Sequence, residues 1–246
     1  MIEAAFSPWP DVAAHFAAGN GLAILPFGAL EQHGPHLPLS TDTATAAEVA
    51  RRLAERLDAL LLPPVNYGAT WNNAGYPGTV SLAPETVTSI VLDIGRALAS
   101  GGARGLVIVN GDWGNRVPLY AAARRLAADG VIATIALDYP GMDAAAAAVR
   151  ESREAAPGLL HAEEIETSLM LAIDPGSVHP ERYTAEYPTF PSDFGTRPMQ
   201  LHHFSASGVF GDPASATAEK GETILAATVE GSLAVLADFV AALPTH

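Results

Sequence analysis

The stretch GLAILPFGALEQHGPHLPLSTDT, residues 21–43, changes character halfway along. Residues 21–27 form a nearly unbroken apolar run, which is typical of a strand buried inside a parallel sheet. The residues that follow include acids, histidines and prolines, where an ordinary core has aliphatic side chains. Because ligands bind at the carboxyl ends of the strands in such sheets, this stretch predicts both the fold class and the position of a site.

Apolar runs and helical patterns alternate along much of the remaining chain. Further apolar runs span 59–65, 104–110 and 131–139, and helical patterns span 43–57, 84–101 and 117–130. This alternation indicates βαβ units, so we expect a mainly parallel sheet with helices on both of its faces. No repeat or linker divides the sequence, and we expect residues 1–246 to form one α/β domain.

The second half of the chain is less regular. We expect an Ala-rich helix over residues 142–156, a further helix that begins near Glu163, and an amphipathic C-terminal helix over residues 224–243. Residues 174–216 are rich in Pro, Gly, Ser, Tyr and Phe and show no sustained period. Such a long segment predicts either a structured excursion over the site or a contact between subunits.

Charge and composition exclude several classes of function. Thirteen basic residues against 27 acidic ones give a net charge of −14, which repels nucleic acid and anionic membrane surfaces. The N-terminus lacks the basic segment and the apolar segment of a signal peptide, so we expect a cytoplasmic protein. Since the chain contains no cysteine, any metal has to be held by histidine and carboxylate side chains.

Three residues of the opening stretch form a candidate metal site. Glu31 and His33 are two positions apart in an extended segment, so we expect their side chains on one side and that of Gln32 on the other. Asp42 lies at the start of a predicted helix, from where it can turn toward the strand ends. Carboxylate and imidazole groups together suit Zn, Mn or Fe.

A second interpretation of the same residues needs no metal. In it the stretch is a hydrogen-bonded loop, Asp42 caps the helix, and His33 and His36 are partly exposed. A His-x-x-His spacing outside a helix is a weak pattern for metal binding. Residue types alone therefore leave both interpretations open.

Five blocks of sequence together resemble the creatininase family of metal-dependent amidohydrolases. In chain order they are PFGALEQHGPHLPLSTDT from residue 26, YGATWNNAGYPGTVSL at 67–82, VIVNGDWGN at 107–115, HAEEIETSLML at 161–171 and GVFGDPASATAEKGE at 208–222. The resemblance implies a three-layer α/β/α sandwich, two divalent metals per chain and hydrolysis of a C–N bond. It also implies a homo-oligomer, commonly a hexamer.

Roles for single residues follow from the same resemblance. Glu31, His33 and Asp42 match the first ligand cluster of the family, and Asp42 takes the place that bridges two metals. His161 matches a histidine near the reacting amide. Glu166 lies in a Glu-Thr-Ser element that borders the metals.

The third block departs from the family pattern. Relatives usually carry Asn-Gly-His-Gly-Gly-Asn there, with a histidine that binds metal, and this chain has Asp112 in that position. An aspartate can still ligate, but it replaces a neutral imidazole by an anionic oxygen, which favours Mn, Fe or Mg over Zn. The expected metal ligands are Glu31, His33, Asp42, Asp112 and Glu166. We expect His36 to brace the loop instead.

The second block departs as well. Relatives commonly carry Glu-His where this chain has Asn72 and Asn73, and an amide hydrogen-bonds but does not carry protons. General acid or base work therefore falls to His161, Glu163 or Glu164. These departures are compatible with an altered hydrolase, a one-metal enzyme or a family member without catalytic activity.

Aromatic residues in the motif blocks predict a substrate pocket. Trp71 and Trp113 lie inside blocks and not on helical core stripes. They form either lid or core packing, or a wall against a planar, uncharged ring or amide. Asn73 and Tyr76 share their block with Trp71 and complete the expected pocket.

Three functional hypotheses follow. The first is an amidohydrolase in which metal-activated water attacks the carbonyl of a small, cyclic or planar amide, with His161 near the leaving nitrogen. The second is a peptidase that trims a small precursor peptide, of the mycofactocin type, although the absence of the third block's histidine argues against it. The third is a non-catalytic binding or assembly subunit, against which the retained acids argue, because an unused site has no need of buried charge.

Overall fold

Five parallel strands form the central sheet of the computed structural model, which describes residues 1–244. The spatial order is β1-β3-β2-β4-β5, so β2 and β4 lie side by side in the middle. In chain order the strands are β1 (Ile2–Glu3), β2 (Leu22–Phe27), β3 (Leu60–Leu61), β4 (Gly105–Asn110) and β5 (Ala133–Leu137). The prediction of a parallel sheet is confirmed.

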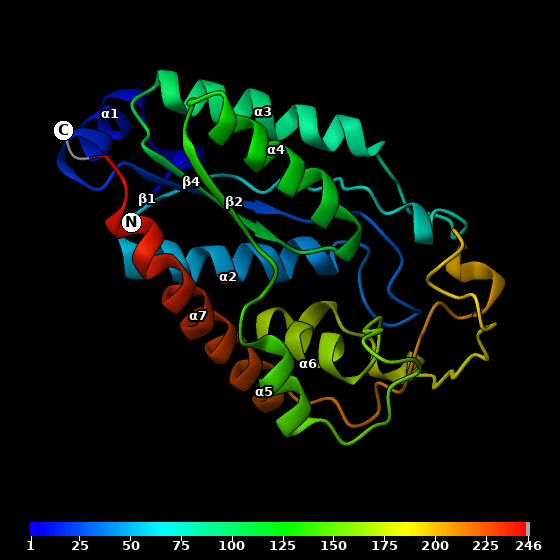
Figure 1. The fold of residues 1–246 in the computed structure, drawn as a ribbon. Helices are drawn as coiled ribbons and strands as arrows, with labels where there is room; N and C mark the ends of the chain where they lie inside the picture. Colours follow the sequence, from blue (N-terminus) through cyan, green and yellow to red (C-terminus); the bar gives the residue numbers. More distant parts are fainter. Residues whose placement is uncertain (245–246) are drawn as a thin grey trace.

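Helices cover both faces of this sheet (Figure 1). One face carries α1 (Trp9–Ala18), α3 (Pro84–Ser100) and α4 (Arg116–Ala128). The other face carries α2 (Thr41–Leu57), α5 (Met142–Val149), α6 (Glu164–Ile173) and α7 (Ala218–Ala241). Short 3-10 helices span Ala4–Phe6, Trp71–Asn73, Trp113–Asn115, Pro175–Ser177, Pro180–Arg182 and Leu201–His203. The expected three-layer α/β/α sandwich is confirmed.

β2 shows why an apolar run becomes a central strand. Leu22 and Ile24 point into the core formed with α2 and α7. The alternate residues Ala23, Leu25 and Phe27 point into the core formed with α3 and α4. Each buried side chain removes apolar surface from water, which stabilises the fold by about 25 cal/mol per Å². The strand can therefore hold the polar loop after it in a defined place.

The strand predicted over residues 59–65 is shorter than expected. Leu60 and Leu61 pair within the sheet, and one isolated bridge joins Phe27 to Val65. Pro63 and Pro64 lie between these pairings. Proline has no N–H group to donate to a strand ladder, so the regular strand ends before them.

The helix predicted over residues 142–156 ends at Val149. The backbone N–H groups of Glu151 and Ser152 donate to the carboxylate of Glu164, at 3.1 and 2.7 Å. Each backbone N–H group is a single donor, so these two are not available to helical carbonyls. The Ala-rich composition predicted a helix but gave no sign of this distant acceptor.

α7 is the one described helix that is long and apolar enough to cross a membrane by length and composition. It packs against α6 and α5 on one face of the sheet (Figure 1). Ile224, Leu225 and Leu236 on this helix are buried in the core. The predicted amphipathic C-terminal helix is confirmed, with an earlier start at Ala218.

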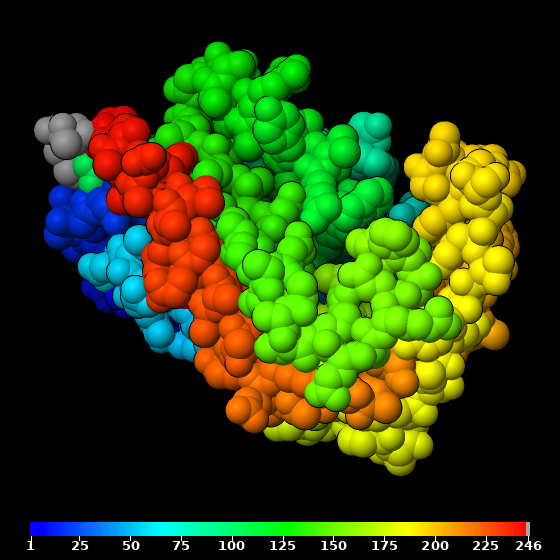
Figure 2. All heavy atoms as spheres, turned by 60° about the horizontal axis from the view of Figure 1, so that its bottom comes forward, coloured from blue at the N-terminus to red at the C-terminus, as the bar shows by residue number. Residues whose placement is uncertain are grey.

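Residues 174–216 form a long excursion in which the described structure contains no α-helix and no strand. Isolated backbone bridges join His161 to Phe210 and Glu186 to Gly211. Figure 2 shows a hollow between the yellow part of this excursion and the green segments of the chain. Because Phe210 of the excursion pairs with His161, the structure agrees with an excursion over the site. A contact between subunits stays a prediction.

Replacing Lys220 by methionine tests the tie between α6 and α7. Lys220 Nζ lies 2.6 Å from Glu164, whose side chain is fully buried. Removing the cation leaves the buried carboxylate with backbone N–H donors alone, so we expect Lys220→Met to lower the free energy of unfolding by about 1.5–3 kcal/mol, the contribution of a hydrogen bond to a charged group. Urea denaturation at neutral pH measures this change.

The matched control is Arg96→Met, which removes an exposed ion pair with Asp93. Exposed pairs contribute about 0–1 kcal/mol, so this variant should unfold nearly like the unaltered protein. Equal losses in the two variants would show that the Lys220 pair has no special role.

Candidate active site

The site forms where the two central strands end. Phe27 at the end of β2 pairs with Asn110 at the end of β4. The loops that follow these strands therefore start side by side. The first loop carries Glu31 and His33, and the second carries Asp112. Parallel strand pairing thus brings together carboxylate and imidazole side chains that are far apart in the sequence.

His33 lies at the centre of the resulting cluster. Its Nε2 atom is 3.2 Å from Asp42 Oδ1, 3.6 Å from Glu166 Oε2 and 4.0 Å from Glu31 Oε1. Its Nδ1 atom lies 3.1 Å from the backbone oxygen of Glu31 and donates to it, because a carbonyl only accepts. In the neutral ring this leaves the Nε2 lone pair facing the carboxylates, as in a metal-ligating histidine.

Two groups of possible ligands share Asp42. Atoms of His33, Asp42 and Glu166 lie within 4.8 Å of one another, and so do atoms of Glu31, Asp42 and Asp112. A carboxylate has two oxygens, so Asp42 can offer one to each group. Imidazole and carboxylate ligands of this kind bind Zn, Mn and Fe.

Several candidate ligand atoms of the cluster are buried without a hydrogen-bond partner among the described residues. They are His33 Nε2, Asp42 Oδ2 and Asp112 Oδ2. Buried polar atoms are normally paired, because leaving one unpaired costs about 1–3 kcal/mol. A cation bound between these atoms would satisfy all three, so the residues present fit a divalent metal.

Burial and mutual repulsion act on the carboxylates of the cluster. Burial, together with repulsion from Asp42 and Asp112, raises the pKa of Glu31 well above its usual value. Burial also raises the pKa of Asp112 to about 8 and the pKa of Glu166 to about 7. These carboxylates resist being ionised together, and a divalent cation would supply the positive charge that their ionised forms need.

Asp42 lies in the first turn of α2 but does not cap the helix. Its carboxylate faces His33, so the interpretation of Asp42 as a simple helix cap is wrong. His36, like His33, is fully buried, which corrects the alternative in which both are partly exposed. Its Nε2 atom lies 3.0 Å from Thr167 Oγ1 on α6, as expected of a residue that braces the loop.

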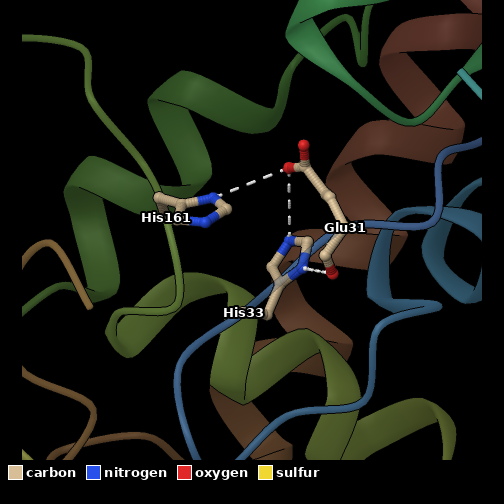
Figure 3. A group of neighbouring side chains, drawn as sticks. All are labelled: Glu31, His33 and His161. Atoms are coloured by element: carbon tan, nitrogen blue, oxygen red, sulfur yellow. Dashed lines mark hydrogen bonds and ion pairs between the residues drawn. The ribbon is translucent and has the colours of Figure 1, made fainter. Parts of the chain in front are cut away.

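Gln32 also reaches the cluster, so the prediction that its side chain points away is wrong. Its Nε2 atom lies 2.6 Å from His161 Nε2 and 2.9 Å from Asn73 Oδ1. His161 Nδ1 in turn lies 3.8 Å from Glu31 Oε1 (Figure 3). Hydrogen bonds hold the long Gln32 side chain in this place, because its Oε1 atom accepts from the backbone N–H of Gly34 and its Nε2 atom donates to the backbone oxygen of Gly208.

The three predicted proton carriers lie in different surroundings. His161 joins the cluster, with its ring centroid 4.6 Å from that of His33, and burial lowers its pKa well below the usual value. Glu163 accepts backbone N–H groups in the first turn of α6, and burial raises its pKa to about 7. Glu164 points toward Lys220 and not toward the cluster.

The four predicted pocket residues differ in burial and in their contacts. Asn73 is buried, and its Nδ2 atom donates to Glu31 Oε2 at 3.1 Å. The Tyr76 hydroxyl donates to a backbone oxygen of the excursion at 2.7 Å. Trp71 and Trp113 are 47% and 68% exposed, so the interpretation of these two residues as core packing is wrong. Their part in a pocket wall stays a prediction.

Tyr139 is a neighbour of the cluster that the sequence patterns did not indicate. It follows β5 with a φ of +46°, a region that bulky residues rarely adopt. Its hydroxyl is buried without a partner among the described residues. Together with Asp42 and Glu166 it lines a cavity of about 30 Å³, which is large enough for a water molecule. The available signal was its position at the end of a predicted strand.

Comparison with known proteins identifies a family model and several relatives that match this chain. The family model described as Creatininase, creatinine amidohydrolase, matches residues 5–236. A mycofactocin precursor peptide peptidase of Mycobacterium ulcerans is 34% identical over 242 residues, which cover 94% of this chain and 86% of the relative. A creatinine amidohydrolase of Pseudomonas putida is 35% identical over 240 residues, which cover 91% of each chain.

Solved structures share the fold over its whole length. The crystal structure of a creatinine amidohydrolase matches with a TM-score of 0.84 and 32% identity, covering 99% of each chain. A Zn-Zn form of a creatininase variant matches with a TM-score of 0.82 and 32% identity, covering 97% of this chain and 98% of that one. A manganese form of creatininase has the same identity and coverage and a TM-score of 0.83.

The variant Asp42→Asn tests the shared carboxylate. Because residues that merely hydrogen-bond a ligand contribute about 10- to 100-fold to metal affinity, loss of a ligand should exceed that range. We expect the affinity for Zn or Mn to fall by more than about 100-fold, measured by chelator competition on the metal-free protein.

The control for this variant is Asp138→Asn. Asp138 lies just after β5 and accepts a hydrogen bond from Asn110, outside both ligand groups. This variant should bind metal like the unaltered protein. If Asp42→Asn also kept full affinity, the assignment of the ligand groups would be wrong.

Proposed function

The chain belongs to the creatininase family, and on that premise we propose that it is a metal-dependent amidohydrolase acting on a C–N amide bond of a small, cyclic or planar substrate. The family model covers residues 5–236, so the proposal concerns the whole domain. Metal-activated water is the attacking group in this proposal.

The observation that carries the proposal is the pair of ligand groups that share Asp42. We propose that each group holds one divalent cation, with Asp42 between them. The unpaired buried atoms of His33 and Asp112 support this arrangement, because each lies in a different group. The Zn-Zn form of a related creatininase supports a two-metal site in the family.

Divalent cations in these places would polarise a carbonyl oxygen and bring the pKa of a bound water toward neutrality. The chain's own residues orient the site around them. Asn73 donates a hydrogen bond to Glu31 Oε2, and His161 Nδ1 faces Oε1 of the same carboxylate. Trp71 shares a 3-10 helix with Asn73, and Trp113 directly follows Asp112. These positions support an aromatic wall beside the reacting amide.

A peptidase that trims a precursor peptide is the second candidate. Its support is the 34% identity with a mycofactocin precursor peptide peptidase, nearly equal to the 35% identity with a creatinine amidohydrolase. Asp112 replaces a histidine that relatives of both kinds usually carry, so it does not separate the two candidates, and the family model described as creatinine amidohydrolase favours the small-amide substrate. A non-catalytic subunit is the least supported candidate, because a site without metal gains nothing from burying these acids.

A reconstitution experiment separates the candidates. The metal-free protein is loaded with Zn, Mn or Fe and assayed against cyclic ureides and lactams and, in parallel, against short peptides. We expect at least one divalent ion per chain and metal-dependent ring opening. Cleavage of peptides alone would support the peptidase, and failure to bind any of the three metals would support the non-catalytic subunit.

Asp112→His tests whether the third block tunes the metal. We propose that Asp112 shifts preference from Zn toward Mn or Fe, because it replaces a neutral nitrogen ligand by an anionic oxygen. The variant should bind Zn more tightly and lose turnover with the native metal. Chelator competition measures the affinities for Zn and Mn. If the ratio of the Zn affinity to the Mn affinity is the same in the variant and the unaltered protein, the proposed role of Asp112 is wrong.

A pair of variants separates the proposed catalytic role of His161 from the structural role of Glu164. We assign Glu164 a structural role because its carboxylate is bound by Lys220 and by backbone N–H groups. His161→Asn should lower kcat by about 100-fold or more, within the range for loss of a hydrogen-bond donor to the reacting carbonyl. Glu164→Gln should keep kcat and lower the free energy of unfolding. Steady-state kinetics and urea denaturation of both variants provide the comparison.

The oligomer and the cytoplasmic location stay predictions. Large apolar side chains are exposed at two places, Phe6 with Trp9 and Val117 with Tyr120, and such patches commonly mark contacts between proteins. They support the proposed homo-oligomer. Size-exclusion chromatography with light scattering distinguishes a hexamer from smaller assemblies.

A further inference from the structure

The side-chain amide of Gln32 is held in a single orientation. Its Oε1 atom lies 2.9 Å from the backbone nitrogen of Gly34, which only donates. Its Nε2 atom lies 3.1 Å from the backbone oxygen of Gly208, which only accepts. Turning the amide over would place donor against donor and acceptor against acceptor, so the NH₂ group faces inward.

Two glycines make room for this amide. Gly34 and Gly208 have φ values of +65° and +79°, which side chains rarely tolerate. A Cβ atom on Gly208 would lie 1.9 Å from Gln32 Oε1, so the amide packs directly against bare backbone. The orientation of Gln32 is therefore built into the fold of two separate loops.

Asn73 fixes the same orientation from the side of the cluster. Its Nδ2 atom donates to Glu31 Oε2 at 3.1 Å, which turns its Oδ1 atom toward Gln32. That oxygen accepts from Gln32 Nε2 at 2.9 Å. An inverted Gln32 amide would set two oxygens against each other here as well.

The orientation of Gln32 determines where His161 carries its proton. His161 Nε2 lies 2.6 Å from Gln32 Nε2, a nitrogen that can only donate. The two hydrogens of this NH₂ group serve three neighbours, Gly208 O, Asn73 Oδ1 and His161 Nε2, and a hydrogen on His161 Nε2 would face a nitrogen that cannot accept it, so His161 Nε2 carries no hydrogen. A doubly protonated ring is excluded for the same reason. The remaining form is the neutral ring with its proton on Nδ1, the atom that lies 3.8 Å from Glu31 Oε1.

We propose that Gln32 is a positioning residue that holds His161 as the neutral Nδ1–H tautomer, facing the cluster as a hydrogen-bond donor. His161 forms a third possible ligand group with Glu31 and His33. A nitrogen that carries a proton cannot bind a metal, so the tautomer keeps His161 Nδ1 out of the ligand set.

This assignment deepens the proposed amidohydrolase function and rests on it for its catalytic meaning. A neutral Nδ1–H group can hold the oxygen of a substrate carbonyl in place. It does not deliver a proton to the leaving nitrogen, because that transfer would leave an imidazolate. His161 is therefore a hydrogen-bond donor to the reacting amide, and the proton for the leaving nitrogen comes from the attacking water.

Nitrogen NMR of the metal-free protein tests the tautomer directly. The chain contains eight histidines, and the spectrum of His161→Asn identifies the signal by its disappearance from histidine-labelled protein. We expect His161 to show a protonated Nδ1 and an unprotonated Nε2. Gln32→Glu places an accepting oxygen where the donor was, so the proton should move to Nε2 and the two shifts should exchange.

Kinetics of the metal-loaded enzyme give a second readout. Gln32→Glu should lower kcat by about 10- to 100-fold, with a smaller change in KM, since the substrate pocket is kept. Gln32→Met removes the hydrogen bonds without adding charge, and should give a mixture of tautomers and a similar loss of kcat.

Gln200→Glu is the matched control. Gln200 donates to the backbone oxygen of Trp71 and does not contact His161, so the same chemical change there should leave the His161 signals in place. A proton on His161 Nε2 in the unaltered protein, or unchanged shifts in Gln32→Glu, would overturn the tautomer assignment. The expected spectra in a protein without hydrolytic activity would support the assignment and overturn the proposed function.

Discussion

The structure depends on holding carboxylates together in a place where they repel one another. Glu31, Asp42 and Glu166 converge on the buried ring of His33, Asp112 lies beside Glu31 and Asp42, and burial raises the pKa of most of these acids. Such an arrangement is stable only when the surrounding fold is rigid or a cation neutralises it. The central pair of strands and the starts of α2 and α6 supply that rigidity, because each ends or begins at the cluster.

Three acids near the start of α6 show how helix geometry separates roles that lie close in the sequence. Glu163 precedes the helix and accepts its first N–H groups. Glu164 and Glu166 lie two positions apart, and a helix turns about 100° per residue, so they point in nearly opposite directions. Glu166 accordingly faces His33, whereas Glu164 faces Lys220. The loss of proton carriers at Asn72 and Asn73 made Glu163 and Glu164 equal candidates for proton transfer, and the helix places them in different surroundings.

Much of the fold and part of the site could be predicted from local patterns. The apolar run at 21–27 and the helical period after it are local signals, and they placed β2, α2 and Asp42 correctly. The end of the helix at Val149 could not be predicted in the same way, because it depends on a hydrogen-bond acceptor in another segment. The inward position of the Gln32 side chain depends on hydrogen bonds with the backbone of Gly34 and Gly208, and neither is visible as a period in the sequence.

The order in which the ligand residues occur along the chain has a consequence during synthesis. Glu31, His33 and Asp42 leave the ribosome early, whereas Glu166 lies on α6, in the last third of the chain. Since α6 packs on α2 and α7, its ligand reaches the cluster only after these helices have docked. A growing chain would therefore offer a cation an incomplete set of the proposed ligands, and metal uptake at this site would be a late event that marks a finished fold.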